Sequence, residues 1–275
     1  RRGNEELGYT FDRTEDGLLI LRDILVEPDL PTTLWYLRNS TDPNKDSGRP
    51  EPSFARARRR TRLSEEDKAD FIPDDEGHVA PRVIEQVEEL TNLSRRFFAP
   101  TAYLRIEKIS LADGHALEIA GVRLESRRLK ELLTNCSECA LFLTTLGHGV
   151  DEPIRVHQDK EDMRGAKIIE AIASAGLLDL TQRVQRRIEL IAKKEKLHVT
   201  HCQWPGFCDW PEEQTTRLLS RVGGTADHPV KWLDGSFEPP WSFVGVVGLG
   251  LDVSRIKNNP CRRCDSRKDC PRRIW

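Results

Sequence analysis

The seven cysteines are the residues of this chain whose spacing points most clearly to chemistry. Three of them, Cys261, Cys264 and Cys270, lie within ten residues of one another. A Cys-x-x-Cys spacing lets two thiolates reach one metal centre, and both zinc and iron–sulfur clusters accept such loops. Residues 255–275 carry eight basic and two acidic side chains, and this positive charge favours thiolates and offsets an anionic cluster. We therefore predict a shared metal centre, with a [4Fe–4S] cluster favoured over zinc.

A second segment, residues 202–214, has the composition of a rigid aromatic turn. It contains two Trp, two Pro and one Gly. Such a turn exposes backbone amides and carbonyls, and its flat walls can hold a planar ligand. From the residues alone, a structural aromatic corner and a ligand-binding loop explain this composition equally well.

Several familiar functional classes find no support. The glycines at 245, 248 and 250 do not form a dinucleotide fingerprint, because no helical pattern follows them. The chain contains neither a Walker-type phosphate loop nor a nucleophile elbow, which disfavours hydrolases. The net charge of −2 argues against general binding to nucleic acids or membranes, and no apolar run approaches the ~18 residues of a membrane span. We expect a soluble, cytoplasmic protein.

The segments that must position these residues are predicted to be helices and strands that alternate along the chain. Apolar residues at spacings of three and four predict a long helix over 161–196. Shorter helices are expected at 83–93 and at 126–135, the latter capped by Ser126. Strands are predicted at 17–22, 103–111, 116–124, 140–146 and 241–251. Because the strands and helices alternate without a regular βαβ rhythm, an α+β fold is expected.

The first hundred residues differ in composition from the rest of the chain. Residues 39–53 are rich in Pro, Ser, Asn and Asp, as linkers are, and 54–62 contain five arginines. The arginine-rich stretch is either a solvated basic segment or an arm that grips an acidic partner. We therefore predict three parts: an N-terminal extension (1–100), a core (101–254) and a cysteine-rich basic tail (255–275).

Four segments resemble, in order, the activation domain of cobalamin-dependent methionine synthases. Pro205-Gly-Phe-Cys-Asp-Trp-Pro-Glu-Glu-Gln214 is similar to that family's Pro-Gly-Tyr-x-Asp-Trp-Pro-x-x-x-Gln loop. Cys136 followed by the apolar run to Gly147, Asp162-x-x-x-Ala166, and the Ser/Pro/Gly segment 236–248 resemble its other elements. The tail resembles that of stand-alone members that work with corrinoid methyltransferases. The resemblance covers about 103–275.

The resemblance implies a C-shaped α+β fold with a twisted antiparallel sheet and a long helix. Its concave face would meet cobalamin carried by a partner, and a shallow groove would bind S-adenosylmethionine through backbone contacts. The oxidised corrinoid is reduced there by one electron and remethylated. On this basis the cofactor-binding residues are Trp204, Pro205, Gly206, Phe207, Asp209, Trp210, Ser242 and Gly245.

Two departures from the family's pattern bear on its ligands. Cys202 stands where the family has the Arg that holds the S-adenosylmethionine carboxylate, and Phe207 replaces a tyrosine. Loss of a charged carboxylate partner weakens binding, so we expect S-adenosylmethionine to bind weakly or not at all. Either Cys202 or Cys208 would be placed to supply a further metal ligand. Cys136 and Cys139 are predicted to be buried thiols.

These observations together predict a corrinoid-servicing protein. It would dock on a cobalamin-binding protein or methyltransferase, accept an electron from a low-potential donor, and support corrinoid reactivation through an iron–sulfur centre. The partner must carry the cobalamin, because the chain lacks the Asp-x-His-x-x-Gly signature of cobalamin binding. The alternative is a non-catalytic assembly subunit of a corrinoid methyltransferase system, with a structural zinc in its tail.

Overall fold

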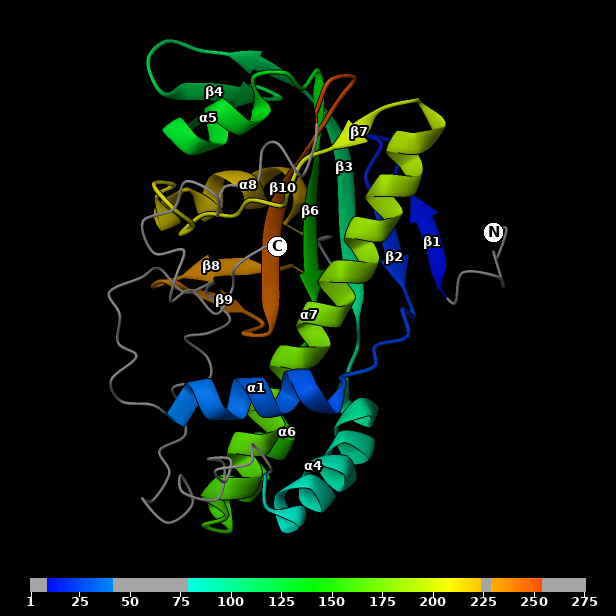
Figure 1. Ribbon diagram of the computed structural model, residues 1–275, viewed down its shortest axis with the longest axis vertical. Coiled ribbons are helices and arrows are strands. Elements are labelled where there is room, and N and C mark those ends of the chain that lie inside the picture. The colour runs from blue at the N-terminus through cyan, green and yellow to red at the C-terminus, as the bar shows by residue number, and fades with distance from the viewer. Residues whose placement is uncertain (1–8, 42–78, 224–228, 254–275) are drawn as a thin grey trace.

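A twisted antiparallel sheet forms the centre of this computed structural model, which describes residues 9–41, 79–223 and 229–253 (Figure 1). Its strands follow the order β1-β2-β3-β6-β10-β7, and β4 and β5 continue from the end of β3. The strands are β1 Thr10–Arg13, β2 Leu19–Arg22, β3 Thr101–Leu111, β4 Ala116–Ile119, β5 Val122–Glu125, β6 Glu138–Thr145, β7 His198–Val199 and β10 Ser242–Gly250. The arginine-rich stretch and the cysteine-rich tail lie outside the described residues.

Strand β6 lies between β3 and β10 and is buried on both faces. Leu143 pairs with Tyr103 on one side and with Val244 on the other. Since side chains alternate between the faces of a strand, Phe142 joins one apolar core while Leu141 and Leu143 join the other. The continuous apolar run that predicted a buried strand here is thus explained by two cores, one on each face.

The first core is covered by helix α7 (Met163–Lys194), which crosses one face of the sheet (Figure 1). Every residue from 165 to 177 is buried, because α1 (Leu30–Thr41), α4 (Pro81–Ser94) and α6 (Asp151–Asp159) pack against the end of α7 away from the strands. Asp162 caps α7 by accepting a hydrogen bond from the Gly165 amide at 2.8 Å. The long helix predicted from apolar spacing is confirmed.

The second core lies on the opposite face of the sheet. It is covered by α5 (Arg127–Leu133), α8 (Thr215–Val222) and a separate hairpin of β8 (Lys231–Leu233) and β9 (Ser236–Glu238) (Figure 1). The remaining described elements are two short 3-10 helices, η4 (Arg95–Phe97) and η5 (Glu212–Gln214). Ser126 caps α5 as predicted, since its Oγ accepts from the Leu129 amide at 3.0 Å.

The described residues before position 100 belong to the same packed body as the rest, although the sequence assigns 1–100 to an extension. Strand β2 pairs with β3 from Leu19↔Leu104 to Arg22↔Thr101. Helices α1 and α4 place Leu37 and Val83 in the first core with no exposed surface. The composition of the N-terminal part concealed this because its apolar residues are few and spread over short elements.

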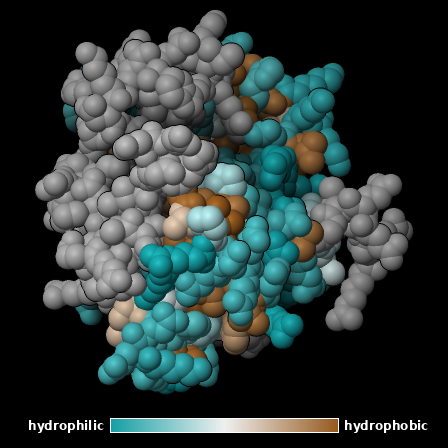
Figure 2. Space-filling view, turned by 60° about the horizontal axis from the view of Figure 1, so that its bottom comes forward, coloured by the Kyte–Doolittle hydropathy of each residue, from teal (hydrophilic) through white to brown (hydrophobic). Residues whose placement is uncertain are grey.

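Residues 116–124 form two strands, where the sequence predicted one. Ala120 and Gly121 both have positive φ angles, of 49° and 78°, and turn the chain into a tight hairpin. Apolar residues recur at spacings of two on each side of the turn, at 117 and 119 and at 122 and 124, and the change of phase between the two sets marks the turn. Figure 2 shows the end of the molecule that carries α1, α4 and α6, where most described residues at the surface are hydrophilic. No described helix combines the length and apolarity that a membrane span requires.

Candidate functional site

The segment 202–214 lies along the edge of β10, just beyond β7. Gln203 and Val246 exchange backbone hydrogen bonds of 2.9 and 2.8 Å, which fixes the start of the segment on the sheet. The segment then folds back, because the Gly206 amide donates to the Trp210 carbonyl at 2.7 Å. Gly206 has a φ of 85°, a left-handed conformation that favours glycine. The predicted rigid turn is present, and we call residues 202–214 the Trp–Pro loop.

The first half of the Trp–Pro loop presents aromatic rings. Trp204 and Phe207 are half-buried, and their ring centroids are 4.4 Å apart. Trp204 also contacts Phe243 of β10 at 5.6 Å, and Phe243 contacts Phe142 of β6 at 6.0 Å. The four rings connect the first core to the loop surface. Phe243 lies outside the loop motif and was therefore not predicted from the sequence as a site residue.

The indole N–H of Trp204 is buried and has no hydrogen-bond partner among the described residues. A buried donor without a partner costs free energy, so its place beside a half-exposed aromatic pair is informative. This part of the loop has the properties of a surface for a planar, partly polar ligand.

The second half of the loop anchors it to helix α5. The Asp209 carboxylate accepts hydrogen bonds of 2.8 Å from the Ser126 hydroxyl and from the Arg127 amide. Asp209 therefore joins Ser126 in capping α5, more than 80 residues away along the chain. The sequence predicted Asp209 to bind a cofactor, but in this structure its oxygens are engaged by the protein itself.

Trp210 and Gln214 complete this anchor. The Trp210 side chain is buried in the second core, and its indole N–H lies 3.3 Å from Gln214 Oε1. Gln214 Oε1 also accepts from the Glu125 amide at 2.9 Å, and its Nε2 donates to the Glu125 carbonyl at 3.1 Å. The Gln214 side chain thus pairs with β5 as a neighbouring strand would. Trp210 and Gln214 therefore hold the loop against the second core and β5. The predicted role of Trp210 in cofactor binding stays a prediction.

Ser242 and Gly245 lie inside the protein beneath the loop. Ser242 is fully buried, and its Oγ lies 2.8 Å from both Thr145 Oγ1 and the Pro239 carbonyl oxygen. At Gly245, a Cβ atom would lie 2.8 Å from Cys202 Sγ, closer than such contacts allow. Pro205 and Gly206 are also buried. Of the predicted cofactor residues within the described part of the chain, Trp204 and Phe207 are the two whose rings reach the surface.

The two cysteines of the Trp–Pro loop have opposite environments. Cys202 is buried and packs against Gly245, whereas Cys208 is exposed and has a φ of 56°. The described residues contain no cluster of three or more His, Cys, Asp or Glu side chains that could hold a metal. Cys261, Cys264 and Cys270 lie outside those residues, so the shared metal centre stays a prediction. As a further ligand, the exposed thiol of Cys208 fits better than that of Cys202.

Cys136 and Cys139 are buried, as predicted. Desolvation raises the pKa of Cys136 to about 11 and holds the pKa of Cys139 well above its ordinary value. Both thiols therefore stay protonated near neutral pH, and they pack as small apolar groups in the second core.

Comparison with known proteins identifies the fold. No protein-family model and no curated protein matches the chain. Among solved structures, the chain is similar to a crystal structure of the MetH reactivation domain bound to AdoHcy, with a TM-score of 0.53 and 13% sequence identity. The match covers 92% of this chain and 85% of that chain. The chain has an activation-domain-like fold. The α+β class and the C-shaped, activation-domain-like architecture expected from the sequence are confirmed.

Proposed function

We propose that this protein services a corrinoid. It docks on a separate cobalamin-binding protein or methyltransferase and supports reductive reactivation of the corrinoid, using electrons from a low-potential donor. The observation that carries this proposal is the likeness of its fold, over 92% of the chain, to the MetH reactivation domain. The composition of the Trp–Pro loop, with its resemblance to the activation-domain loop, supports the same conclusion independently of the fold.

The Trp–Pro loop is the face that would meet the corrinoid. Trp204 and Phe207 offer two half-exposed rings that contact each other in a tilted arrangement, and the rest of the loop is held by Asp209 and Gln214. A loop that is ordered before its partner arrives loses little conformational entropy on binding. The protein's own residues thus bind and orient a planar group and exclude water from one side of it.

An iron–sulfur centre would be held by Cys261, Cys264 and Cys270, with Cys208 as the further ligand. Such a centre supplies one-electron transfer when it is bound. Cys208 lies next to Phe207 in the chain, so this ligand set would bring the centre to the aromatic face of the loop. Cys208 is exposed at the surface of the described core.

A ligand of the S-adenosylmethionine class would bind weakly. The neighbour was solved with AdoHcy, so this class is the one to test. Cys202 cannot replace an arginine at this position, because its thiol is buried against Gly245 and is a weak donor. Loss of a hydrogen bond to a charged group costs about 1.5–3 kcal/mol, which is about 10- to 100-fold in affinity. Calorimetry on the wild-type protein should detect no micromolar binding of S-adenosylmethionine.

Metal and sulfide analysis of anaerobically purified protein tests the redox part of the proposal. We expect iron and acid-labile sulfide, with broad absorbance near ~400 nm, in the wild type. Cys261→Ser and Cys208→Ser should lose iron, and Cys136→Ser, at a buried thiol, is the matched control that should keep it. One tightly bound zinc and no sulfide would instead support the assembly subunit and contradict an electron-transfer role.

A reactivation assay tests the docking face. A cobalamin-binding partner is oxidised, and the rate of its one-electron reduction is followed with a chemical donor. Trp204→Ala and Phe207→Ala should slow this rate strongly, while Phe97→Ala, which removes an exposed ring on η4, should leave it unchanged. Equal rates in all three variants would exclude the Trp–Pro loop as the active face.

A further inference from the structure

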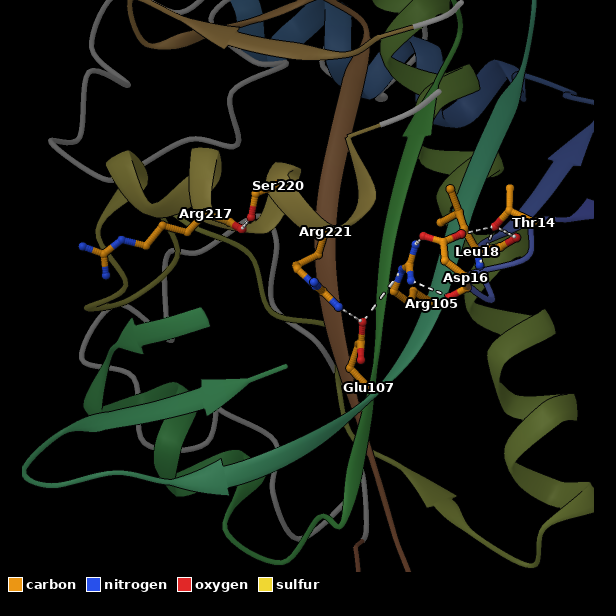
Figure 3. A network of polar contacts seen from close by, with 8 residues as sticks. All are labelled: Thr14, Asp16, Leu18, Arg105, Glu107, Arg217, Ser220 and Arg221. Atoms are coloured by element: carbon orange, nitrogen blue, oxygen red, sulfur yellow. Dashed lines mark hydrogen bonds and ion pairs between the residues drawn. The ribbon is translucent and has the colours of Figure 1, made fainter. Parts of the chain in front are cut away.

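Four charged residues link the β1–β2 turn to helix α8 across the sheet face opposite α7 (Figure 3). Arg105 and Glu107 are two residues apart in β3, so both project from the same face. Asp16 comes from the turn between β1 and β2, and Arg221 comes from the last turn of α8. We call these four residues the Arg105 network.

The contacts within the Arg105 network are unequal. Arg105 donates one hydrogen bond to the Asp16 carboxylate at 2.6 Å and another to the Asp16 carbonyl at 2.8 Å. Its Nε lies 3.8 Å from Glu107 Oε1, which is too far for a hydrogen bond. Arg105 thus donates hydrogen bonds to Asp16, while its contact with Glu107 is an ion pair without a hydrogen bond.

Within the Arg105 network, Glu107 is hydrogen-bonded by Arg221. The Arg221 guanidinium donates to Glu107 Oε1 at 2.8 Å. The Arg105 and Glu107 side chains are only 13% and 15% exposed, so a charge displaced by an ångström here is poorly screened by water. If the Arg105 guanidinium turned fully toward Glu107, it would compete with Arg221 for the same carboxylate oxygen.

The position of α8 matters because the helix starts where the Trp–Pro loop ends. Gln214, the last residue of the loop, directly precedes Thr215, the first residue of α8. The helix has only eight residues, and besides the packing of Leu218 and Val222 in the second core, the described part of the chain gives it one other side-chain hydrogen bond to the sheet, the exposed one from Arg217 to the Arg123 carbonyl. Release of Arg221 would therefore loosen the element that carries the end of the loop.

We propose that Arg105 is a two-position switch that couples the β1–β2 turn to α8. While Asp16 binds Arg105, Glu107 holds Arg221 and α8 is fixed. A cationic group on a partner that takes the Asp16 carboxylate frees Arg105 to bind Glu107, and Arg221 is released. The β1–β2 turn is then a contact point for a basic partner surface, and its occupation is transmitted to the Trp–Pro loop. This coupling goes beyond the proposed corrinoid function and needs no corrinoid to be observed.

Hydrogen exchange of the α8 amides tests this coupling in the full-length protein. Asp16→Asn should speed exchange at 218–222 by about 3- to 10-fold, the range expected for residues of one charge network. Arg105→Met should not speed it, because Arg221 then has no competitor. Glu107→Gln should speed it whether or not Asp16 is replaced. Asp12→Asn, which breaks the Asp12–Arg22 ion pair in the same hairpin, is the matched control and should leave α8 unchanged.

The double variant Asp16→Asn with Arg105→Met decides the mechanism. If Arg105 carries the signal, α8 in the double variant exchanges as slowly as in Arg105→Met alone. Faster exchange in the double variant than in Arg105→Met, or no effect of Asp16→Asn on α8, would overturn the proposal. Exchange at the β2 amides, read in the same experiment, shows whether a variant has merely unfolded the hairpin. None of these outcomes depends on corrinoid reactivation, so failure here leaves the proposed function untouched.

Discussion

At the scale of single residues, the glycines of β10 allow neighbouring segments to approach the strand closely. A Cβ atom at Gly245 would lie 2.8 Å from both Cys202 Sγ and Phe142 Cζ. On the opposite face, a Cβ at Gly248 would lie 2.4 Å from Leu133 and 2.6 Å from Cys136 Sγ. These short distances explain why glycines occur here although they do not form a nucleotide-binding motif. Each glycine leaves room for neighbouring side chains, Gly245 on one face of the strand and Gly248 on the other.

Gly245→Ala tests the contact beneath the Trp–Pro loop. The added methyl group must displace Cys202 or Phe142, so we expect a loss of about 1–3 kcal/mol in the free energy of unfolding. Cys202→Ala removes the sulfur atom and makes room for the added methyl group. Gly245→Ala should therefore destabilise the Cys202→Ala protein less than it destabilises the wild type. Urea denaturation measures all four proteins. No recovery in the double variant would mean that Phe142, rather than Cys202, limits the space at this position.

The described cysteines should differ sharply in reactivity. Iodoacetamide at pH 8 should label Cys208 rapidly and Cys136 and Cys139 slowly, because thiolates react and burial raises the pKa of both buried thiols. For Cys136 the folded state favours the protonated thiol. Its contribution to stability is therefore complete below about pH 9 and is lost as the pH rises through about 11. Peptide mapping by mass spectrometry measures the labelling, and equal rates at Cys136 and Cys208 would contradict the burial of Cys136.

At the scale of elements, one carboxylate joins the Trp–Pro loop to α5. Asp209 and Ser126 together satisfy the first amides of that helix. Asp209→Ala should cost about 1–2 kcal/mol of stability, the range of a lost helix cap. It should also speed hydrogen exchange in both α5 and the loop, since each loses its tie to the other. Glu213→Ala, an exposed carboxylate in η5, is the control, and an equal loss in that variant would show that charge rather than capping is responsible.

The sequence predicted the elements whose patterns are long and uniform. Helix α7 and strand β6 were found because a 3.6-residue period and a continuous apolar run each persist over many residues. Helix α6 was missed, since its Pro153 and polar residues are typical of a loop. The hairpin of β4 and β5 was taken for one strand, although the apolar alternation changes phase between Ile119 and Val122, where Ala120 and Gly121 form the turn.

The candidate site was predicted as a segment but not as a structure. The composition of residues 202–214 indicated a rigid turn, and the turn is present. The partners of Asp209 and Gln214 are 82 to 89 residues earlier in the chain, in α5 and β5. No local spacing encodes contacts at that separation. The sequence therefore predicted the turn, but it could not separate the residues that reach the surface from those that anchor the loop.

At the scale of the whole molecule, the core is completed by segments from both ends of the sequence. Strand β2 extends the sheet beyond β3, and α1 and α4 cover α7. Leu21, Leu37, Val83 and Val87 are each at most 1% exposed in the first core. Single burial events of this kind contribute about 1.5–3 kcal/mol each, and the stability of a whole domain is only about 5–15 kcal/mol. The N-terminal segments are thus too large a part of the core to be dispensable.

A fragment of residues 101–275, which corresponds to the predicted core and tail, should therefore fail to fold. Without β2, the first four residues of β3, Thr101 to Leu104, would lose their strand partners. Without α1 and α4, the face of α7 that packs against them would be exposed to water. We expect the fragment to bind a hydrophobic dye, to lose near-ultraviolet circular dichroism and to unfold without a cooperative transition. A fragment of residues 9–253 keeps every described element and is the matched control, which should unfold cooperatively. A cooperative transition in 101–275 would show that the packing of α1, α4 and β2 against α7 and β3 adds to an already stable domain, and the boundary at residue 100 would then be a real one.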